Sequence, residues 1–204
     1  MLVTSTELPL FPLQAVLFPG GLLNLKVFEA RYLDLMAACL RESRPFGVVA
    51  LRSGHEVRRG DTAVSFATCG VLAKLLDVDS TQPGILQVRC RGTERFELTT
   101  TRQQPDGLWL AGIRTLPADE IVAPTQALLE TVRGLANAIA SLKSQGTEPF
   151  LHPFRFEDTG WVANRWCEIL PISLAAKQKL MELPDPLVRL QLVDEFLRGK
   201  GVVK

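Results

Sequence analysis

The sequence is poor in the residues that build metal sites, disulfide frameworks and covalent active sites. Its 204 residues include only four cysteines and two histidines. Cys39, Cys69, Cys90 and Cys167 are widely and irregularly spaced, and no two of them form a C-x-x-C pair. Zinc sites need closely spaced ligands, and disulfides need an oxidising compartment. We therefore expect buried free thiols in a reducing cytosol, with no metal bound.

Motifs for nucleotide hydrolysis and nucleophilic catalysis are also missing. No G-x-x-x-x-G-K-[ST] phosphate-binding loop occurs in the sequence. His55 has no serine or cysteine partner in a recognisable nucleophile motif. The sequence thus predicts a protein that is not an enzyme and that needs no cofactor.

Charge and hydropathy count against nucleic-acid-binding and membrane-spanning proteins. The 23 basic and 22 acidic residues nearly cancel, so no broad electrostatic field would attract nucleic acid or an anionic membrane. No window approaches the roughly 18 consecutive apolar residues of a membrane span. Pro9, Pro12 and Pro19 interrupt the apolar N-terminal stretch, which has no signal-peptide pattern. We expect a cytoplasmic protein with neither nucleic acid nor membrane as its partner.

What is present in the first half is a succession of β-type segments with one helix among them. With 47% hydrophobic residues the chain can build a proper core. Residues 8–13 predict a short apolar strand, a second apolar strand follows the Pro19-Gly20 turn, and helical spacing follows from Glu29 to about Glu42. The prolines at 9 and 12 favour an edge strand, a strand start or a turn over the middle of a sheet. Further strands are predicted up to residue 116, with bends at Gly70 and Gly92.

The pattern changes to helical periodicity after the segment 117–124. A long apolar stripe covers residues 125–144. Asp158, Ser173 and the pair Asp185-Pro186 are suitable first residues for three more helices. The predicted fold is therefore of the α+β class, with a β-rich part in residues 1–117 and a helical part in residues 118–204.

Several motifs resemble a known family. Leu8-Pro9-Leu10-Phe11-Pro12-Leu13, followed by Leu17-Phe18-Pro19-Gly20 and by Val27-Phe28-Glu29-Ala30-Arg31-Tyr32, closely resembles the start of the Lon protease N-terminal, substrate-recognition domain. The resemblance continues in Gly92-Thr93-Glu94-Arg95-Phe96 and, near the end, in Leu170-Pro171-Ile172 and Lys177-Gln178-Lys179-Leu180-Met181-Glu182. It therefore covers nearly the whole chain.

The resemblance implies both a fold and a role. The fold is a PUA-like β-barrel with one inserted helix, in residues 1–117, followed by a C-terminal helical bundle, in residues 118–204. The role is recognition of unfolded or tagged polypeptide, or of a protein partner, in protein quality control, at the surface between barrel and bundle. ATP hydrolysis and proteolysis do not carry over, because their motifs are absent.

An RNA-binding PUA-like module is the alternative function. PUA-like barrels also occur in RNA-modifying proteins, so the resemblance permits this function too. Near-neutral charge and the lack of a basic, aromatic stripe count against it, since phosphate contacts need clustered Lys and Arg. The sequence leaves the oligomeric state open.

Two groups of residues are candidates for the polypeptide-binding surface. Arg31 and Tyr32 open the first helix, where Arg31 either contacts a partner or braces the barrel while Tyr32 packs inward. Phe150, Phe154 and Phe156 lie in an irregular aromatic segment, which either packs into the core or is exposed as a docking surface. A basic loop with Arg52, His55, Arg58 and Arg59 is more typical of a solvated loop than of a nucleic-acid site.

Overall fold

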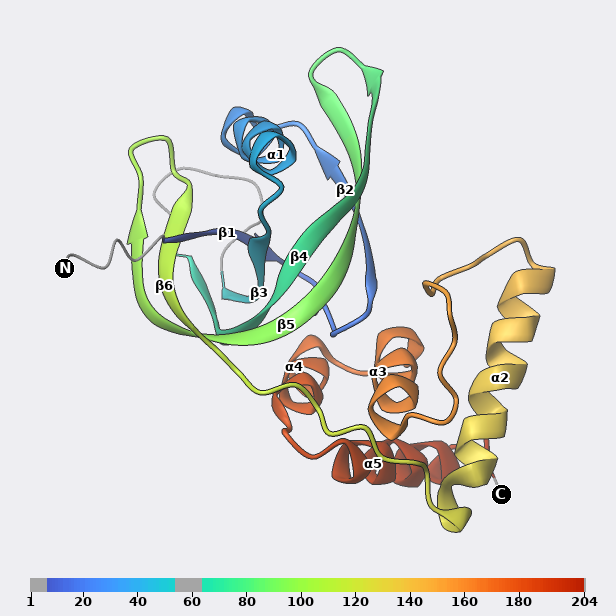
Figure 1. The fold of residues 1–204 in the computed structure, drawn as a ribbon. Helices are drawn as coiled ribbons and strands as arrows, with labels where there is room; N and C mark the ends of the chain where they lie inside the picture. Colours follow the sequence, from blue (N-terminus) through green and yellow to red (C-terminus); the bar gives the residue numbers. More distant parts are fainter. Residues whose placement is uncertain (1–6, 54–63, 204) are drawn as a thin grey trace. The chain divides into compact units, whose positions relative to one another are not determined.

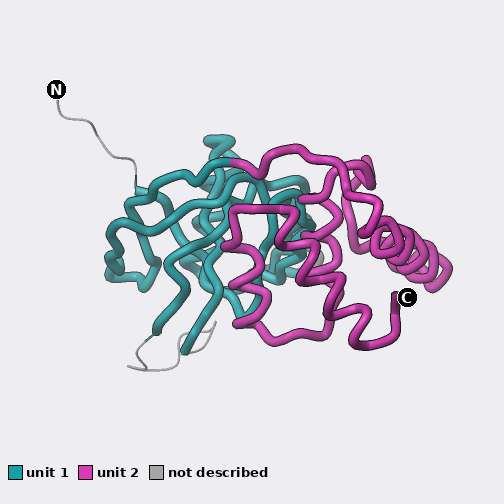
Figure 2. Tube along the Cα trace, turned by 90° about the horizontal axis from the view of Figure 1, so that it is seen from below, with its two compact units in different colours: residues 1–117 teal, residues 118–204 magenta. Residues whose placement is uncertain are grey.

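The computed structural model describes residues 7–53 and 64–203, which form a mixed α+β fold. The chain divides into two compact units, residues 1–117 and 118–204 (Figure 2). The described strands lie in the first unit, and most of the described helices lie in the second. His55, Arg58 and Arg59 of the basic loop lie outside the described residues.

The first unit is built on one sheet that closes on itself (Figure 1). The described strands follow the order β2-β5-β4-β3-β1-β6, and β6 also pairs with β5. All neighbouring strands are antiparallel except β1 and β3. The strands are β1 (Leu8–Leu13), β2 (Leu22–Val27), β3 (Phe46–Ser53), β4 (Ser65–Gln82), β5 (Ile85–Gln103) and β6 (Trp109–Thr115).

Alternation along the strands decides which side chains enter the core. In β5, Val88 and Cys90 are buried, whereas Gln87, Arg89 and Arg91 are exposed. This period of two is the one that the sequence predicts for a strand with one face in a core and the other in solvent.

Two glycines mark places where backbones approach closely. A Cβ atom added to Gly70 would lie 2.4 Å from the Val48 carbonyl oxygen, and one added to Gly92 would lie 2.3 Å from the Phe18 carbonyl oxygen. The sequence predicts bends at both glycines, and the structure adds the physical reason why no larger residue fits there.

The prolines of β1 lie inside the sheet and not on an outermost strand. β1 pairs with β6 through Leu8–Leu10 and with β3 through Leu10–Leu13. Among the described strands, each half of β1 therefore has a neighbour on one side only, apart from the shared Leu10. A proline needs one side without a hydrogen-bonding partner, and each half of β1 meets that need locally.

Helix α1 (Ala30–Glu42) is the one described helix of the first unit. Its buried face carries Tyr32, Leu35, Met36 and Cys39, as the helical spacing predicts. The helix ends at Ser43, which has left-handed backbone angles.

The second unit consists of helices and their connections. The first turn, η1 (Gln126–Leu128), leads into α2 (Leu129–Ser144), and α3 (Thr159–Ile169), α4 (Leu174–Glu182) and α5 (Pro186–Gly199) follow. The side chains of Asp158, Ser173 and Asp185 each accept hydrogen bonds from backbone N–H groups at the start of a helix. The capping residues predicted from the sequence are therefore confirmed.

Candidate functional site

A cavity of about 320 Å³ lies in the first unit beside β1, β2 and the start of α1. Most of its lining is apolar, with Lys26, Asn24 and Glu29 as the polar exceptions. We call this cavity the β1–β2 groove. Its apolar lining residues include Phe11, Leu13, Leu23, Leu25, Val27, Phe28 and Tyr32.

An aromatic pair forms one wall of the β1–β2 groove. The rings of Phe11 and Tyr32 stack with centroids 3.9 Å apart, and both residues are buried. By contrast, Phe28 is 51% exposed although it also lines the groove. The groove therefore combines a fixed aromatic wall with an apolar side chain that solvent reaches.

Arg31 is held in place by three neighbours. Its guanidinium forms a 2.9 Å ion pair with Glu29, donates a 2.7 Å hydrogen bond to the Gly107 carbonyl and lies 4.6 Å from the centre of the Tyr32 ring. These contacts fit the interpretation that Arg31 braces the sheet. Of the candidate pair, Tyr32 lines the β1–β2 groove, and Arg31, which is not part of the lining, contacts the Tyr32 ring.

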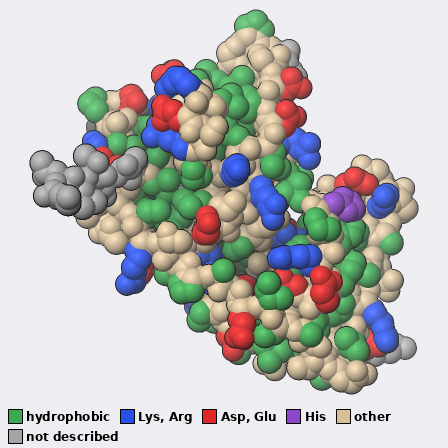
Figure 3. All heavy atoms as spheres, in the orientation of Figure 1, with side chains coloured by type: hydrophobic (Ala, Val, Ile, Leu, Met, Phe, Trp, Pro, Cys, Tyr) green, Lys and Arg blue, Asp and Glu red, His purple; other side chains and the backbone are tan. Residues whose placement is uncertain are grey.

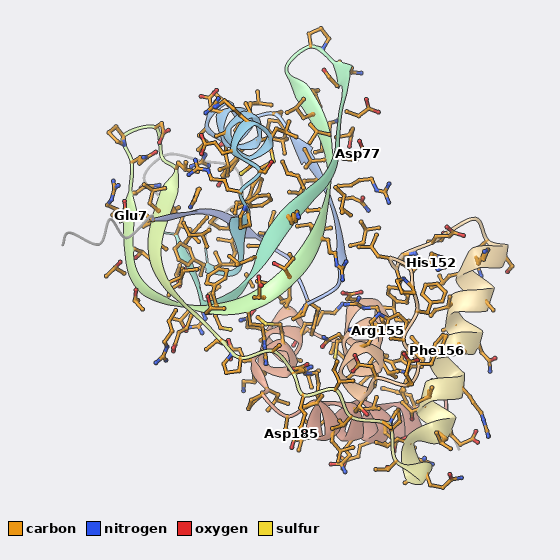
Figure 4. The ribbon with its side chains drawn as sticks, viewed as in Figure 1. Glu7, Asp77, His152, Arg155, Phe156 and Asp185 are labelled. Carbon is orange, nitrogen blue, oxygen red and sulfur yellow. The ribbon has the colours of Figure 1, made fainter. Side chains whose placement is uncertain are left out.

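The other three candidates come together in the second unit, in the segment between α2 and α3, where Figure 4 labels Phe156. Phe150 is buried, whereas Phe154 and Phe156 are half-buried. All three rings contact Trp161 of α3, with centroids 6.4, 5.8 and 5.4 Å away respectively. The segment is thus packed on α3 through one tryptophan, and parts of two phenylalanine rings remain accessible.

A buried ion pair, formed by Arg165 and Glu168 of α3, lies next to this aromatic segment. Arg165 is fully buried, pairs with Glu168 at 2.8 Å and lies 5.8 Å from the ring centres of both Phe150 and Trp161. Burial raises the pKa of Glu168 to about 7, against the opposing attraction of Arg165 and Lys177. Sequence reasoning misses this ion pair, because its residues look like an ordinary polar face of a helix.

Burial keeps two of the cysteine thiols unreactive. Burial raises the pKa of Cys90 and of Cys167 to about 12, so both thiols stay protonated at neutral pH. In the part of the chain that the structure describes, no three histidine, cysteine or acidic side chains gather in a way that would hold a metal ion. Nor do the described helices include one long and apolar enough to cross a membrane.

Comparison with known proteins identifies the family. Residues 7–199 match the model of the ATP-dependent protease La (LON) substrate-binding domain. The chain belongs to this family. The resemblance of its sequence motifs to the Lon N-terminal domain is thereby confirmed.

Relatives of known sequence are much longer than this chain. It is 25% identical over 203 residues to a Lon protease of Anaeromyxobacter dehalogenans, an alignment that covers 95% of this chain and 23% of that protein. It is 27% identical over 127 residues to the protein cereblon of Xenopus tropicalis, covering 60% of this chain and 26% of cereblon. The chain thus spans about a quarter of the length of these relatives.

Two solved structures share the fold over nearly their whole length. A Lon N-terminal domain protein from Xanthomonas campestris is 30% identical, with a TM-score of 0.70 over 92% of this chain and 96% of that one. The N-terminal domain of the Mycobacterium avium complex Lon protease is 17% identical, with a TM-score of 0.61 over 93% of this chain and 97% of the other. The second likeness concerns the fold alone.

Proposed function

We propose that this protein recognises polypeptide substrates, binding unfolded or tagged segments without catalysing a reaction itself, and that it acts in protein quality control. The observation that carries the proposal is the match to a substrate-binding domain family over residues 7–199. We also propose that the closed sheet is a PUA-like barrel and that α2–α5 form a helical bundle.

The β1–β2 groove is the surface that best fits this role. Unfolded chains differ from folded ones in exposing apolar side chains, and an apolar groove binds such groups with little sequence specificity. Phe28 and Leu23 supply accessible contact area, the buried stack of Phe11 and Tyr32 gives the groove a fixed wall, and Arg31 holds that wall in place. Phe150, Phe154 and Phe156 are proposed to form a second surface, to which the partly exposed Phe154 and Phe156 give access.

RNA binding is not favoured as the alternative. Arg89, a candidate phosphate contact on β5, lies opposite Asp77 of β4. Acidic and basic side chains are interspersed over the face shown in Figure 3. Such mixed charge weakens the electrostatic attraction on which nucleic-acid binding depends.

Calorimetric titration tests the proposal. The full chain is titrated with one protein in two forms, its native form and a form kept unfolded by reduction and carboxymethylation, and with a single-stranded RNA. We expect binding of the unfolded form only. Absence of binding to the unfolded form, or tighter binding of the RNA, would overturn the proposal.

A matched pair of variants locates the surface. Phe28→Ser removes an exposed side chain of the β1–β2 groove, and Leu40→Ser removes one of nearly equal exposure on α1, outside the groove lining. We expect Phe28→Ser to weaken binding of the unfolded protein several-fold and Leu40→Ser to leave it unchanged. Equal effects would show that the groove is not the binding surface.

A further inference from the structure

We propose that the β1–β2 groove takes its ligand as an added β-strand. In this inference, which rests on the proposed function, an extended polypeptide pairs with the free edge of β2. Its alternate side chains are apolar toward the groove and acidic toward Lys26. The ligand class is therefore an extended segment of alternating apolar and acidic residues, about as long as β2.

The β1–β2 groove follows the edge of β2 and not one of its faces. Its lining includes all of the consecutive residues Leu23 to Val27. Successive side chains of a strand point to opposite faces of a sheet, so a cavity on one face would touch only every second residue. A cavity touched by five in a row must run alongside the strand. No described residue of β5, which pairs with the other edge of β2, contributes to the lining.

Both walls of the groove offer backbone without a strand partner. Among the described residues, β2 pairs with β5 alone, in a register without shifts. On the opposite wall, Phe11 to Leu13 of β1 pair with β3 but not with β6. Pro12 has no N–H to donate, so β2 is the wall better able to bind a strand. An edge of this kind is a template for pairing with another chain, and added strands bind by main-chain hydrogen bonds.

The side of the ligand that faces the groove meets an apolar surface. Leu25 and Val27 point into the core and are buried, and Leu23 on the same face is half-buried. A strand added beside them in register places alternate side chains against Leu23 and the stacked rings of Phe11 and Tyr32. Apolar side chains are the ones that gain from this contact.

The opposite side of the ligand meets the basic side chain of Lys26. Lys26 is exposed there, and Arg89 and Arg91 of β5 lie opposite Asn24 and Leu22 of β2. Strands are about 4.8 Å apart, so Lys26 would be next to the ligand, whereas Asp77 of β4 would be three strands, or about 14 Å, away. Exposed charges more than about 8 Å apart are largely screened at physiological salt, which applies to Asp77 and also to Arg89 and Arg91, about 10 Å away on the second strand. Glu29 of the lining is already paired with Arg31, so the exposed Lys26 sets the charge next to the ligand on this side and favours acidic side chains there.

The experiment uses a short fluorescent peptide in which leucine and glutamate alternate, and its affinity is measured by anisotropy with the full chain. A second peptide has the same side chains but N-methyl groups on alternate amides, so that it cannot pair as a strand on that side. A third has lysine in place of glutamate. We expect the N-methylated peptide to bind about tenfold more weakly, since two or more hydrogen bonds are lost. We expect Lys26→Glu to reverse the preference between the glutamate and lysine peptides.

Two tryptophan substitutions provide the matched control. Ala15 is exposed and lines the groove, and Ala37 is exposed on α1 outside the lining. Ala15→Trp should fill the groove and abolish peptide binding, whereas Ala37→Trp should not change it. Circular dichroism confirms that both variants fold.

The outcomes separate this inference from the proposed function. Equal binding of the N-methylated and unmethylated peptides would overturn strand addition, as would equal affinities of the two tryptophan variants. Either result leaves polypeptide recognition standing if the wild-type chain still binds the carboxymethylated unfolded protein. Failure to bind that protein would contradict the proposed function itself.

Discussion

Phe154 is the single residue at which packing and recognition compete most directly. Its ring stacks on His152 at 4.2 Å and contacts Phe156 at 6.0 Å and Trp161 at 5.8 Å. Truncation of a fully buried phenylalanine costs about 3–5 kcal/mol, and a half-buried ring should cost about 2 kcal/mol. We predict that Phe154→Ser lowers the free energy of unfolding by about this amount, measured by urea denaturation.

The same variant also tests whether the second proposed surface, formed by Phe150, Phe154 and Phe156, binds polypeptide. If Phe154 contributes to recognition, the folded fraction of Phe154→Ser should bind the unfolded protein several-fold more weakly than the wild type. A loss of stability with unchanged affinity would assign the aromatic segment to packing alone.

Glu168 predicts an unusual dependence of stability on pH. Burial raises the pKa of its carboxyl from the ordinary value of 4.5 to about 7 in the folded protein. Between these pH values the folded state holds a proton that the unfolded state has released, so stability falls as pH rises through this window. The loss is on the order of 3 kcal/mol, because each pKa unit corresponds to about 1.4 kcal/mol.

Comparison with Glu168→Gln isolates this effect, because glutamine does not ionise. Stability of the wild type minus that of Glu168→Gln should decrease between pH 4.5 and 7 and stay level above. Glu195→Gln, on the solvent-accessible side of α5, is the control. A difference that is constant with pH, or that rises, would contradict the account.

At the scale of elements, the close approach of β4 to β3 at Gly70 gives the clearest prediction. An added Cβ would meet the Val48 carbonyl oxygen at 2.4 Å, and backbone cannot move aside as a flexible side chain can. We predict that Gly70→Ala lowers the free energy of unfolding by about 1–3 kcal/mol. Gly199→Ala, where an added Cβ meets nothing, should be neutral or slightly stabilising. Equal stabilities of the two variants would show that the strands adjust freely.

Elements defined by local signals could be predicted from the sequence. The starts of α3 and α5 could be predicted because the side chains of Asp158 and Asp185 cap the first turn of the helix that follows them, and Pro186 suits the first turn of α5. The inside position of β1 could not be predicted from Pro9 and Pro12. It depends on which distant strands pair with each half of β1, and no local pattern encodes that choice.

The candidate site is only partly predictable for the same reason. A sequence motif points to Tyr32, which does line the β1–β2 groove. No motif points to Phe11 as a site residue, because its stacking on Tyr32 depends on the tertiary fold. The free edge of β2 depends on the fold as well, although the alternation of Leu23, Leu25 and Val27 with Asn24 and Lys26 is typical of a strand with one polar face.

At the scale of the whole molecule, each compact unit carries one of the two proposed binding surfaces. The first unit has an open apolar groove beside an edge of β2 that pairs with none of the described strands. The second has an aromatic segment fixed on α3 over a buried arginine. The match to the substrate-binding domain family covers residues 7–199 and therefore includes both units. The central claim is that this chain recognises unfolded polypeptide and does so in the β1–β2 groove.

Amide hydrogen exchange of the full chain, measured with and without the carboxymethylated unfolded protein, tests that claim most directly. Backbone N–H groups that gain a hydrogen-bonding partner exchange more slowly. The account predicts slower exchange in Leu22–Val27 and around Phe11 when the unfolded protein is present, and no change with its native form. Unchanged exchange throughout β2, under conditions in which the unfolded protein is bound, would contradict it.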